Sequence, residues 1–193
     1  NRNIVVMDED VEGTTVPKVF GDNLLGGQLA ARHFIDAGHR KLAYVGGSRN
    51  IMTSRERAHG FADEVAKHGG EIVVELFGHY TMDYGRAAMA MLFDNYPDVT
   101  GVFIGADQVM YGMAELARER GKRFGTDVSI ITYDDVGPLS LLDPPVTAIH
   151  QPVEEIGRIG FELLMKRMAD DMSNPLIRVP VTLVERASVR RLR

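Results

Sequence analysis

The feature that most constrains the fold is a repeated alternation of short apolar runs with longer stretches of helical periodicity. Apolar runs of strand length occur at Ile4–Met7, Lys41–Val45, Ile72–Leu76, Gly101–Ile104, Val128–Tyr133 and Val146–Ile149. From residue 41 to residue 128 the runs begin about 30 residues apart, which is the length of one strand–helix–strand unit. The alternation predicts an α/β fold with a mostly parallel sheet flanked by helices.

Five stretches between or after these runs repeat apolar residues every three or four positions, which is typical of amphipathic helices. They are marked by Leu25 to Phe34, Phe61 and Val65, Met89 to Phe93, Val109 to Ala117, and Ile156 to Leu163. Gly38, Gly69 and Gly121 stand where three of the helices should end, because glycine enters the left-handed conformation at least cost. Thr53-Ser54-Arg55-Glu56 predicts a capping box at the start of the second helix.

Composition excludes several classes of function. The 193 residues include no cysteine, which rules out disulfides, thiolate metal sites and a cysteine nucleophile and fits a reducing cytoplasm. The net charge of −5 predicts poor binding to nucleic acid by this segment alone. No apolar run approaches the roughly 20 residues that a membrane span needs, so no membrane contact is predicted. Because the chain begins Asn-Arg-Asn, we expect further protein upstream of residue 1.

The sequence carries no enzyme motif of the common kinds. There is no GxGxxG after a strand, no GxxxxGK[ST], no HExxH and no GxSxG, and the six histidines lack metal-ligand spacing. We therefore predict no catalytic residues, no metal and no cofactor.

Polar side chains follow the predicted strands at their carboxyl ends, where open parallel sheets bind ligands. Arg57 lies on the helix that follows the Gly46-Gly47-Ser48 turn, and Tyr80 and Asp107 come after the next two strands. Tyr133, Asp134 and Asp135 end the strand after those. An arginine fork, carboxylate acceptors and an aromatic face are the composition of a pocket for a polar small molecule.

Each of these residues also has a structural interpretation. Arg57 could form a surface salt bridge. However, a cation in the first turns of a helix is unfavourable because it opposes the helix dipole, and a residue kept at an unfavourable position is more often functional. Tyr80 could cap the sheet edge, and Asp107 could be a helix N-cap. Asp134 and Asp135 should point to opposite faces, which makes them a poor acid–base pair and one of them structural.

Ordered motifs along nearly the whole chain resemble the lactose-repressor family of bacterial transcription regulators. They are Asp22-Asn23 to Gly26-Gly27, His33-Phe34-Ile35, Gly38-His39-Arg40-Lys41, Val45-Gly46-Gly47, Arg57 to Phe61, Asp107 to Gly112, Asp127 to Ile130, Tyr133-Asp134-Asp135, Pro144 to Thr147, Gln151-Pro152 and Leu183 to Arg186. Each motif is weak alone, and their order and spacing together are specific.

The resemblance implies a periplasmic-binding-protein-like fold of two lobes that the chain crosses between three times. Residues 1–21 and 151–179 would form part of an N-terminal lobe that is incomplete here. Residues 22–150 and 180–193 would form the C-terminal lobe of the effector-binding domain. The DNA-binding helix-turn-helix would be absent from this chain, so operator DNA would be contacted only through that missing N-terminal domain.

The resemblance also implies site residues. Effector contacts would fall at Arg57, Tyr80 and Asp134, with further matches at Asp8 and Gln151. Dimer contacts would fall at Tyr111 and Leu142. The family's asparagine before Asp107 is Ala106 here, so one hydroxyl-binding amide is lost.

The resulting hypothesis is a cytoplasmic, non-enzymatic sensor domain of a homodimeric repressor, with a sugar, polyol or nucleobase as effector. Two alternatives remain open. An extracytoplasmic solute-binding protein of a transporter would have the same architecture, and an α/β enzyme acting on sugars would turn its ligand over.

Overall fold

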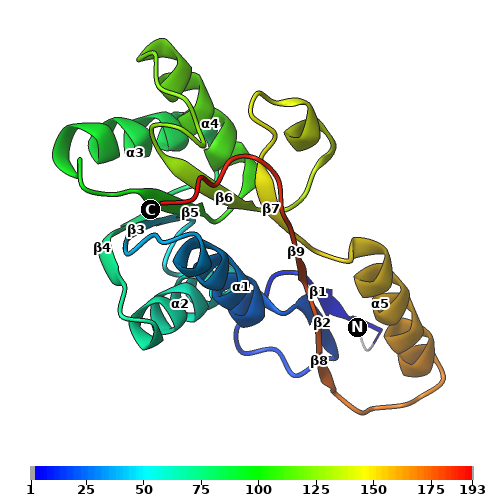
Figure 1. The fold of residues 1–193 in the computed structure, drawn as a ribbon. Helices are drawn as coiled ribbons and strands as arrows, with labels where there is room; N and C mark the ends of the chain where they lie inside the picture. Colours follow the sequence, from blue (N-terminus) through cyan, green and yellow to red (C-terminus); the bar gives the residue numbers. More distant parts are fainter. Residues whose placement is uncertain (1–2, 193) are drawn as a thin grey trace.

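The computed structural model describes residues 3–192 as two bodies, each built around its own β-sheet (Figure 1). The larger body has a six-stranded sheet in the order β4-β3-β5-β6-β7-β9. Its strands pair in parallel except β9, which runs antiparallel to β7. The strands are β3 (Lys41–Gly46), β4 (Glu71–Phe77), β5 (Gly101–Ile104), β6 (Ser129–Tyr133), β7 (Thr147–His150) and β9 (Thr182–Val184).

Helices cover both faces of this sheet, and side chains alternate between the two resulting cores. Along β3, Ala43 and Val45 pack on the side of α3 (Met82–Asn95) and α4 (Asp107–Glu119). Leu42 and Tyr44 face α1 (Asn23–Asp36) and α2 (Met52–Lys67). Because helices cover both faces of the sheet, its central strands are apolar along their length. Polar side chains that bind ligand are therefore expected at the carboxyl ends of the strands.

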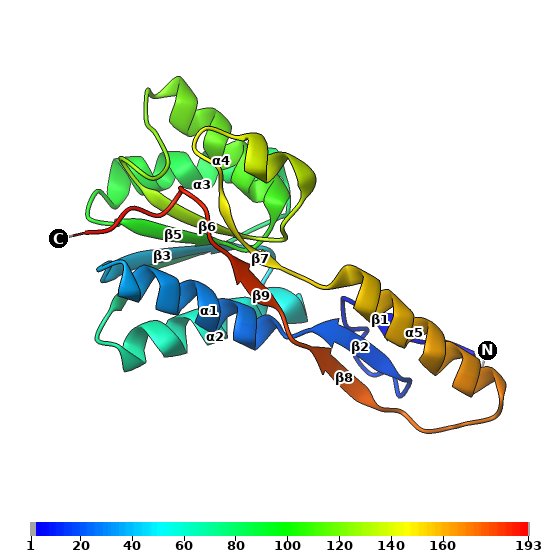
Figure 2. The ribbon, with the colours of Figure 1, turned by 45° about the vertical axis from the view of Figure 1, so that its right-hand side comes forward.

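The smaller body is assembled from the two ends of the chain. Its three-stranded parallel sheet has the order β1-β2-β8, formed by β1 (Val6–Met7), β2 (Lys18–Gly21) and β8 (Leu176–Val179). Helix α5 (Val153–Met168) packs on this sheet through Ile156 and Leu163, which meet Val19 and Val179. Figure 2 shows α5 lying along one side of these strands.

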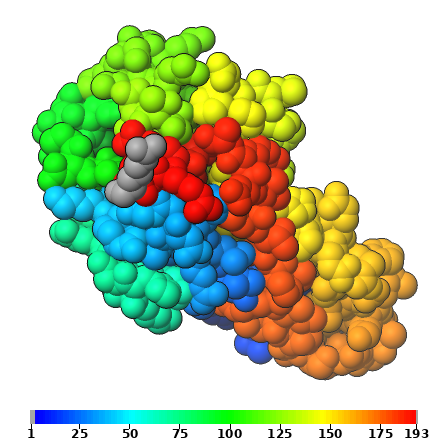
Figure 3. Space-filling model, viewed as in Figure 1, coloured from blue at the N-terminus to red at the C-terminus, as the bar shows by residue number. Residues whose placement is uncertain are grey.

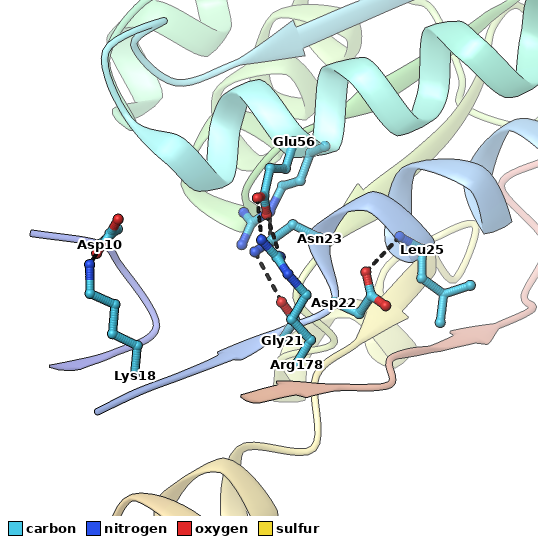
Figure 4. Close-up of polar contacts among 9 residues, drawn as sticks. Asp10, Lys18, Gly21, Asp22, Asn23, Leu25, Glu56 and Arg178 are labelled. Carbon is cyan, nitrogen blue, oxygen red and sulfur yellow. Dashed lines mark hydrogen bonds and ion pairs between the residues drawn. The ribbon is translucent and has the colours of Figure 1, made fainter. Parts of the chain in front are cut away.

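The chain passes between the bodies three times, from β2 to α1, from β7 to α5 and from β8 to β9. In the space-filling view the smaller body projects from the larger one (Figure 3). Beside the first crossing, Arg178 of β8 donates two hydrogen bonds to Glu56 of α2, at 2.7 and 2.5 Å (Figure 4). Asp22 caps α1 by accepting a hydrogen bond from the Leu25 amide at 3.0 Å. The ion pair gives the crossing region a direct side-chain link between the bodies.

The paired helices on each face approach so closely that glycine is required at the contact. A Cβ atom on Gly60 of α2 would lie 2.2 Å from the Leu24 carbonyl oxygen of α1, and one on Gly27 would lie 2.3 Å from the Arg57 carbonyl oxygen. On the opposite face, a Cβ on Gly112 would lie 2.0 Å from the Met82 carbonyl oxygen. The position of α2, and of the side chains it carries, therefore depends on backbone-to-backbone packing.

Most elements predicted from the sequence are present. The five helices and the six strands occur at the predicted places, although β1 starts at Val6 rather than Ile4. Gly38, Gly69 and Gly121 have positive φ values of 92°, 69° and 66°, as expected for residues that end helices. No helix among residues 3–192 is long and apolar enough to cross a bilayer.

The predicted capping box was wrong. Helix α2 begins at Met52 after Ile51, which provides no side-chain cap, so Thr53 and Ser54 lie inside the helix. Ser54 donates its hydroxyl to the Gly47 carbonyl at 3.0 Å and so ties the preceding turn to the helix. Glu56 is turned outward to Arg178 instead of back to the helix start.

Candidate functional site

A cavity of about 540 Å³ lies where the two bodies meet, and all six side chains predicted to bind ligand line it. The larger body contributes Arg57 from α2, Tyr80 and Asp134 from loops at the carboxyl ends of strands, and Asp107 from the start of α4. Asp8 follows β1 of the smaller body, and Gln151 lies in the crossing from β7 to α5. Further lining residues are Met7, Glu9, Thr53, Ala106, Gln108, Val153, Ile156 and Gly157.

Arg57 lies at the base of this cavity and is only 5 % exposed, so the surface salt bridge considered above does not form. Its Nε donates to the Asn23 Oδ1 atom at 2.8 Å, and its Nη1 donates to the Gly105 carbonyl at 2.6 Å. The guanidinium carbon sits 3.5 Å from the centre of the Tyr133 ring, which is fully buried beneath it. The fork is thus fixed in direction before any ligand arrives.

The electrostatic surroundings keep Arg57 charged. Burial acts to lower the pKa of its guanidinium, but Tyr133 and Asp134 nearby act in the other direction and the net change is upward. For the Asp134 carboxyl, burial raises the pKa because it disfavours the charged form, and the nearby Arg57 charge opposes this increase. An arginine and a carboxylate that line the same cavity can bind a ligand through donors and acceptors together.

Asp8 and Asp134 share an uncommon backbone conformation. Each is the first residue after its strand, and their φ values of 67° and 69° lie in the left-handed region that few side chains other than Asn and Asp tolerate. The Asp134 Oδ1 atom accepts a hydrogen bond from Gln151 Nε2 at 2.6 Å. Strained positions that converge on one cavity from two different sheets are characteristic of binding sites.

Two polar atoms at the cavity are buried without a partner. The hydroxyl of Tyr80 and the Oε1 atom of Gln151 form no hydrogen bond to any residue within 3–192. Gln151 is 8 % exposed, and Tyr80 packs across Gly47, where a Cβ atom would lie 2.2 Å from the ring. Since buried polar atoms are normally paired, both are unusual, although the Oε1 atom of Gln151 lies against Gly21, where a Cβ atom would be 2.4 Å from it.

The other acidic residues at the rim divide into two roles. Asp107 is not the N-cap of α4, because Ala106 occupies that position and Asp107 is the first helical residue, its Oδ1 accepting the Gln108 amide at 2.7 Å. Asp135 points away from the cavity and pairs with Arg186 at 2.8 Å. The prediction that one member of the Asp134–Asp135 pair is structural is thereby confirmed.

The sequence did not predict two features of the site, which are the residue that holds Arg57 in place and the apolar side chains that line the cavity. Asn23 holds Arg57 and donates to the Gly21 carbonyl at 3.1 Å (Figure 4), yet its position in the Asp22-Asn23 motif gave no sign of this role. The apolar wall formed by Met7, Val153 and Ile156 comes from the smaller body. No cluster of His, Asp or Glu that could hold a metal occurs in the described part of the chain.

A larger and more apolar cavity, about 810 Å³, lies on the outer side of α4. Tyr111 and Leu142, predicted to contact a second copy, both line it, together with Ala114, Ala117, Phe124 and Val146. Charged side chains also line it, namely Glu115, Arg118, Lys122, Arg123 and Asp143, but all of its lining comes from the larger body. We take the smaller cavity as the candidate ligand site because both bodies contribute polar side chains to it.

Comparison with known proteins places the chain in a family. Residues 31–189 match the family model described as periplasmic binding protein-like domain. The chain is 33 % identical over 157 residues to the HTH-type transcriptional regulator CelR of Thermobifida fusca, covering 80 % of this chain and 46 % of that protein. It is 29 % identical over 191 residues to the HTH-type transcriptional repressor PurR of Vibrio atlanticus, covering 97 % of this chain and 57 % of that one.

Among solved structures, a LacI family transcriptional regulator from Enterococcus faecium with bound ribose superposes with a TM-score of 0.88 at 27 % identity, covering 98 % of this chain and 71 % of that one. The chain spans about half the length of the curated relatives it matches. The match of the family model over most of the chain and the shared fold agree with the ordered motifs in the sequence. The chain therefore belongs to the periplasmic binding protein-like family, and it is similar in sequence and fold to the corresponding part of LacI-type transcriptional regulators.

Proposed function

We propose that this chain senses a small polar metabolite and controls operator binding by a transcription repressor. The observation that carries the proposal is the convergence of Arg57, Asp134 and Asp8 from two separate sheets on one cavity. The ribose-bound regulator of the same fold supports a sugar-like effector. The protein would act in the cytoplasm, where the operator is, and reach DNA through a helix-turn-helix outside this chain.

The mechanism follows from the position of the site between two bodies. We assign residues 3–21 and 151–179 to one lobe and residues 22–150 and 180–192 to the other, in line with the two sheets. Residues 1, 2 and 193 of the predicted lobes lie outside the described residues. A ligand that binds both lobes favours one angle between them, and it can shift the equilibrium only by its different affinity for the two arrangements. In a dimer this would alter the spacing of the DNA-binding heads, with a typical coupling of about 1–3 kcal/mol.

Calorimetry with the full-length protein tests the proposal. We expect at least one member of a panel of pentoses, hexoses, disaccharides, polyols and purines to bind, and to change operator affinity by about 5–150-fold. No binding across the panel would end the sensor proposal. Binding without any effect on DNA, in a protein that a signal peptide exports, would favour a transporter's solute-binding protein instead.

We further propose that the apolar cavity on α4 is covered by a second copy of the chain. Tyr111 carries a hydroxyl that is buried without a partner among the described residues, and Leu142 lines the same cavity. Leu142→Asp in the full-length protein should weaken dimerisation by about 30-fold or more, because a charge at an apolar interface centre costs about 2 kcal/mol. Sedimentation velocity measures this, with Met91→Asp, at an exposed site on α3 outside the cavity, as control. An unchanged dimer in Leu142→Asp would refute this interface.

A further inference from the structure

The charges that line the ligand cavity are strongly unbalanced. Among the described lining residues, Arg57 is the one permanent cation, and it faces four carboxylates, which are those of Asp8, Glu9, Asp107 and Asp134. With all four ionised the lining carries three more negative than positive charges. Because field lines concentrate in a cleft with apolar walls, such as the wall formed by Val153 and Ile156, this imbalance acts on whatever enters.

Arg57 can meet an added anion with only part of its donor fork. Its Nε and Nη1 atoms donate to Asn23 and to the Gly105 carbonyl, and its charge already attracts Asp134. Asp134 in turn is close enough to Asp8 and Asp107 for both to act on its ionisation, beyond the effect of burial. A ligand carboxylate would therefore meet one engaged cation and a group of like charges.

The hydrogen-bonding capacity of the lining is also one-sided. Acceptors predominate, since four carboxylates line the cavity beside one permanently charged donor group, the Arg57 guanidinium. At Ala106, where the family resemblance leads one to expect an amide, the side chain offers no donor. A lining rich in acceptors is best satisfied by a ligand rich in O–H or N–H donors.

We propose that this site selects uncharged or cationic polyhydroxylated ligands and rejects their carboxylate- and phosphate-bearing relatives. This inference deepens the proposed function and rests on it. It makes Asp8 a residue that determines specificity, because Asp8 faces the cavity from the smaller body, where no lining residue within 3–192 offers a compensating cation.

The test compares matched ligands by calorimetry on the full-length protein. One series is glucose, glucosamine and glucuronate, the second is ribose and ribose 5-phosphate, and the third is cellobiose and its aldonic acid. In each series that binds, we expect the acidic member to bind at least about tenfold more weakly than its neutral parent, since each unfavourable contact of about 1.4 kcal/mol costs a factor of ten. Glucosamine should bind at least as tightly as glucose.

A variant at Asp8 tests whether the weaker binding of acidic ligands is caused by the carboxylates that line the cavity. Asp8→Asn keeps a residue that tolerates the left-handed backbone, and it should narrow the gap between acidic and neutral ligands by about tenfold. Asp36→Asn removes the same charge from the exposed far end of α1 and should leave the gap unchanged. Tighter binding of an acidic member than of its parent would overturn the inference while leaving the sensor function intact. Failure of every series to bind would overturn both.

Discussion

Replacing Arg57 by alanine is expected to weaken effector binding by about 100-fold while operator affinity stays within about twofold. The guanidinium is fixed by two hydrogen bonds and by the Tyr133 ring, so its remaining donor atoms are held in place for the ligand. Hydrogen bonds to a charged group contribute about 1.5–3 kcal/mol each, which corresponds to about 10–150-fold in affinity. Calorimetry for effector and fluorescence anisotropy for operator measure the two affinities separately.

Two further variants separate binding from folding. Arg57→Lys keeps the charge but loses the planar fork, and we expect it to recover little of the lost affinity. Arg55→Ala, on the same helix but with an exposed side chain outside the cavity, should bind effector normally. If Arg57→Ala lost effector and operator affinity equally, Arg57 would be a structural residue that anchors Asn23 and Gly105 rather than a ligand contact.

Gly60→Ala should lower the free energy of unfolding by about 3 kcal/mol, which is the upper end of the usual cost of overpacking. The added methyl group would lie 2.2 Å from the Leu24 carbonyl oxygen, and that oxygen belongs to the backbone of α1, which cannot turn away as a flexible side chain could. For a chain of this size the loss corresponds to a drop of roughly 6–12 °C in the melting temperature. Because Arg57 lies one turn earlier on α2, ligand affinity should fall as well.

Gly157→Ala provides the matched control for this substitution. Gly157 also lies inside a helix, α5, but no atom comes within 4 Å of the position that its Cβ would take. Removing a helical glycine there should raise stability by up to about 1 kcal/mol. Chemical denaturation would measure both variants, and an equal response of the two would show that close packing of α1 and α2 is not what requires glycine at position 60.

The large sheet could be predicted because its information is local. Runs such as Gly101–Ile104 are continuously buried, and the neighbouring helices end at glycines. Hydrophobic periodicity and glycine positions were therefore sufficient to predict the strands and helices of the larger body. The rim of the site followed from one general rule about carboxyl ends of parallel strands, which found Arg57 and Asp134 without any family comparison. Asp8 and Gln151 came from the resemblance, although Asp8 directly follows the apolar run Ile4–Met7 and Gln151 lies two residues after the run Val146–Ile149, so the same rule could have found both.

The rest depends on contacts that no short window of sequence contains. Strands β2, β8 and β9 have four residues or fewer, which is too short for a clear periodicity. Strand β2 pairs with β8, and almost all of the larger body lies between these two strands in the sequence. The hydrogen bond between Asn23 and Arg57 joins residues 34 positions apart. The capping box failed because Glu56 has a stronger partner in Arg178, a charged group 122 positions away.

The pairing of Lys18 with Leu176 and of Gly21 with Val179 has a consequence for how the chain must assemble. Both bodies are built from segments that are separated in the sequence, so no single cut in the chain would release either body whole. Pairing β2 with β8 closes a loop that contains most of the chain, and in an unfolded chain this closure costs conformational entropy. Contacts between residues so far apart in the sequence form slowly. The central α/β unit, whose neighbouring elements are close in sequence, is therefore expected to condense first and to bring the two chain ends together for the remaining sheet.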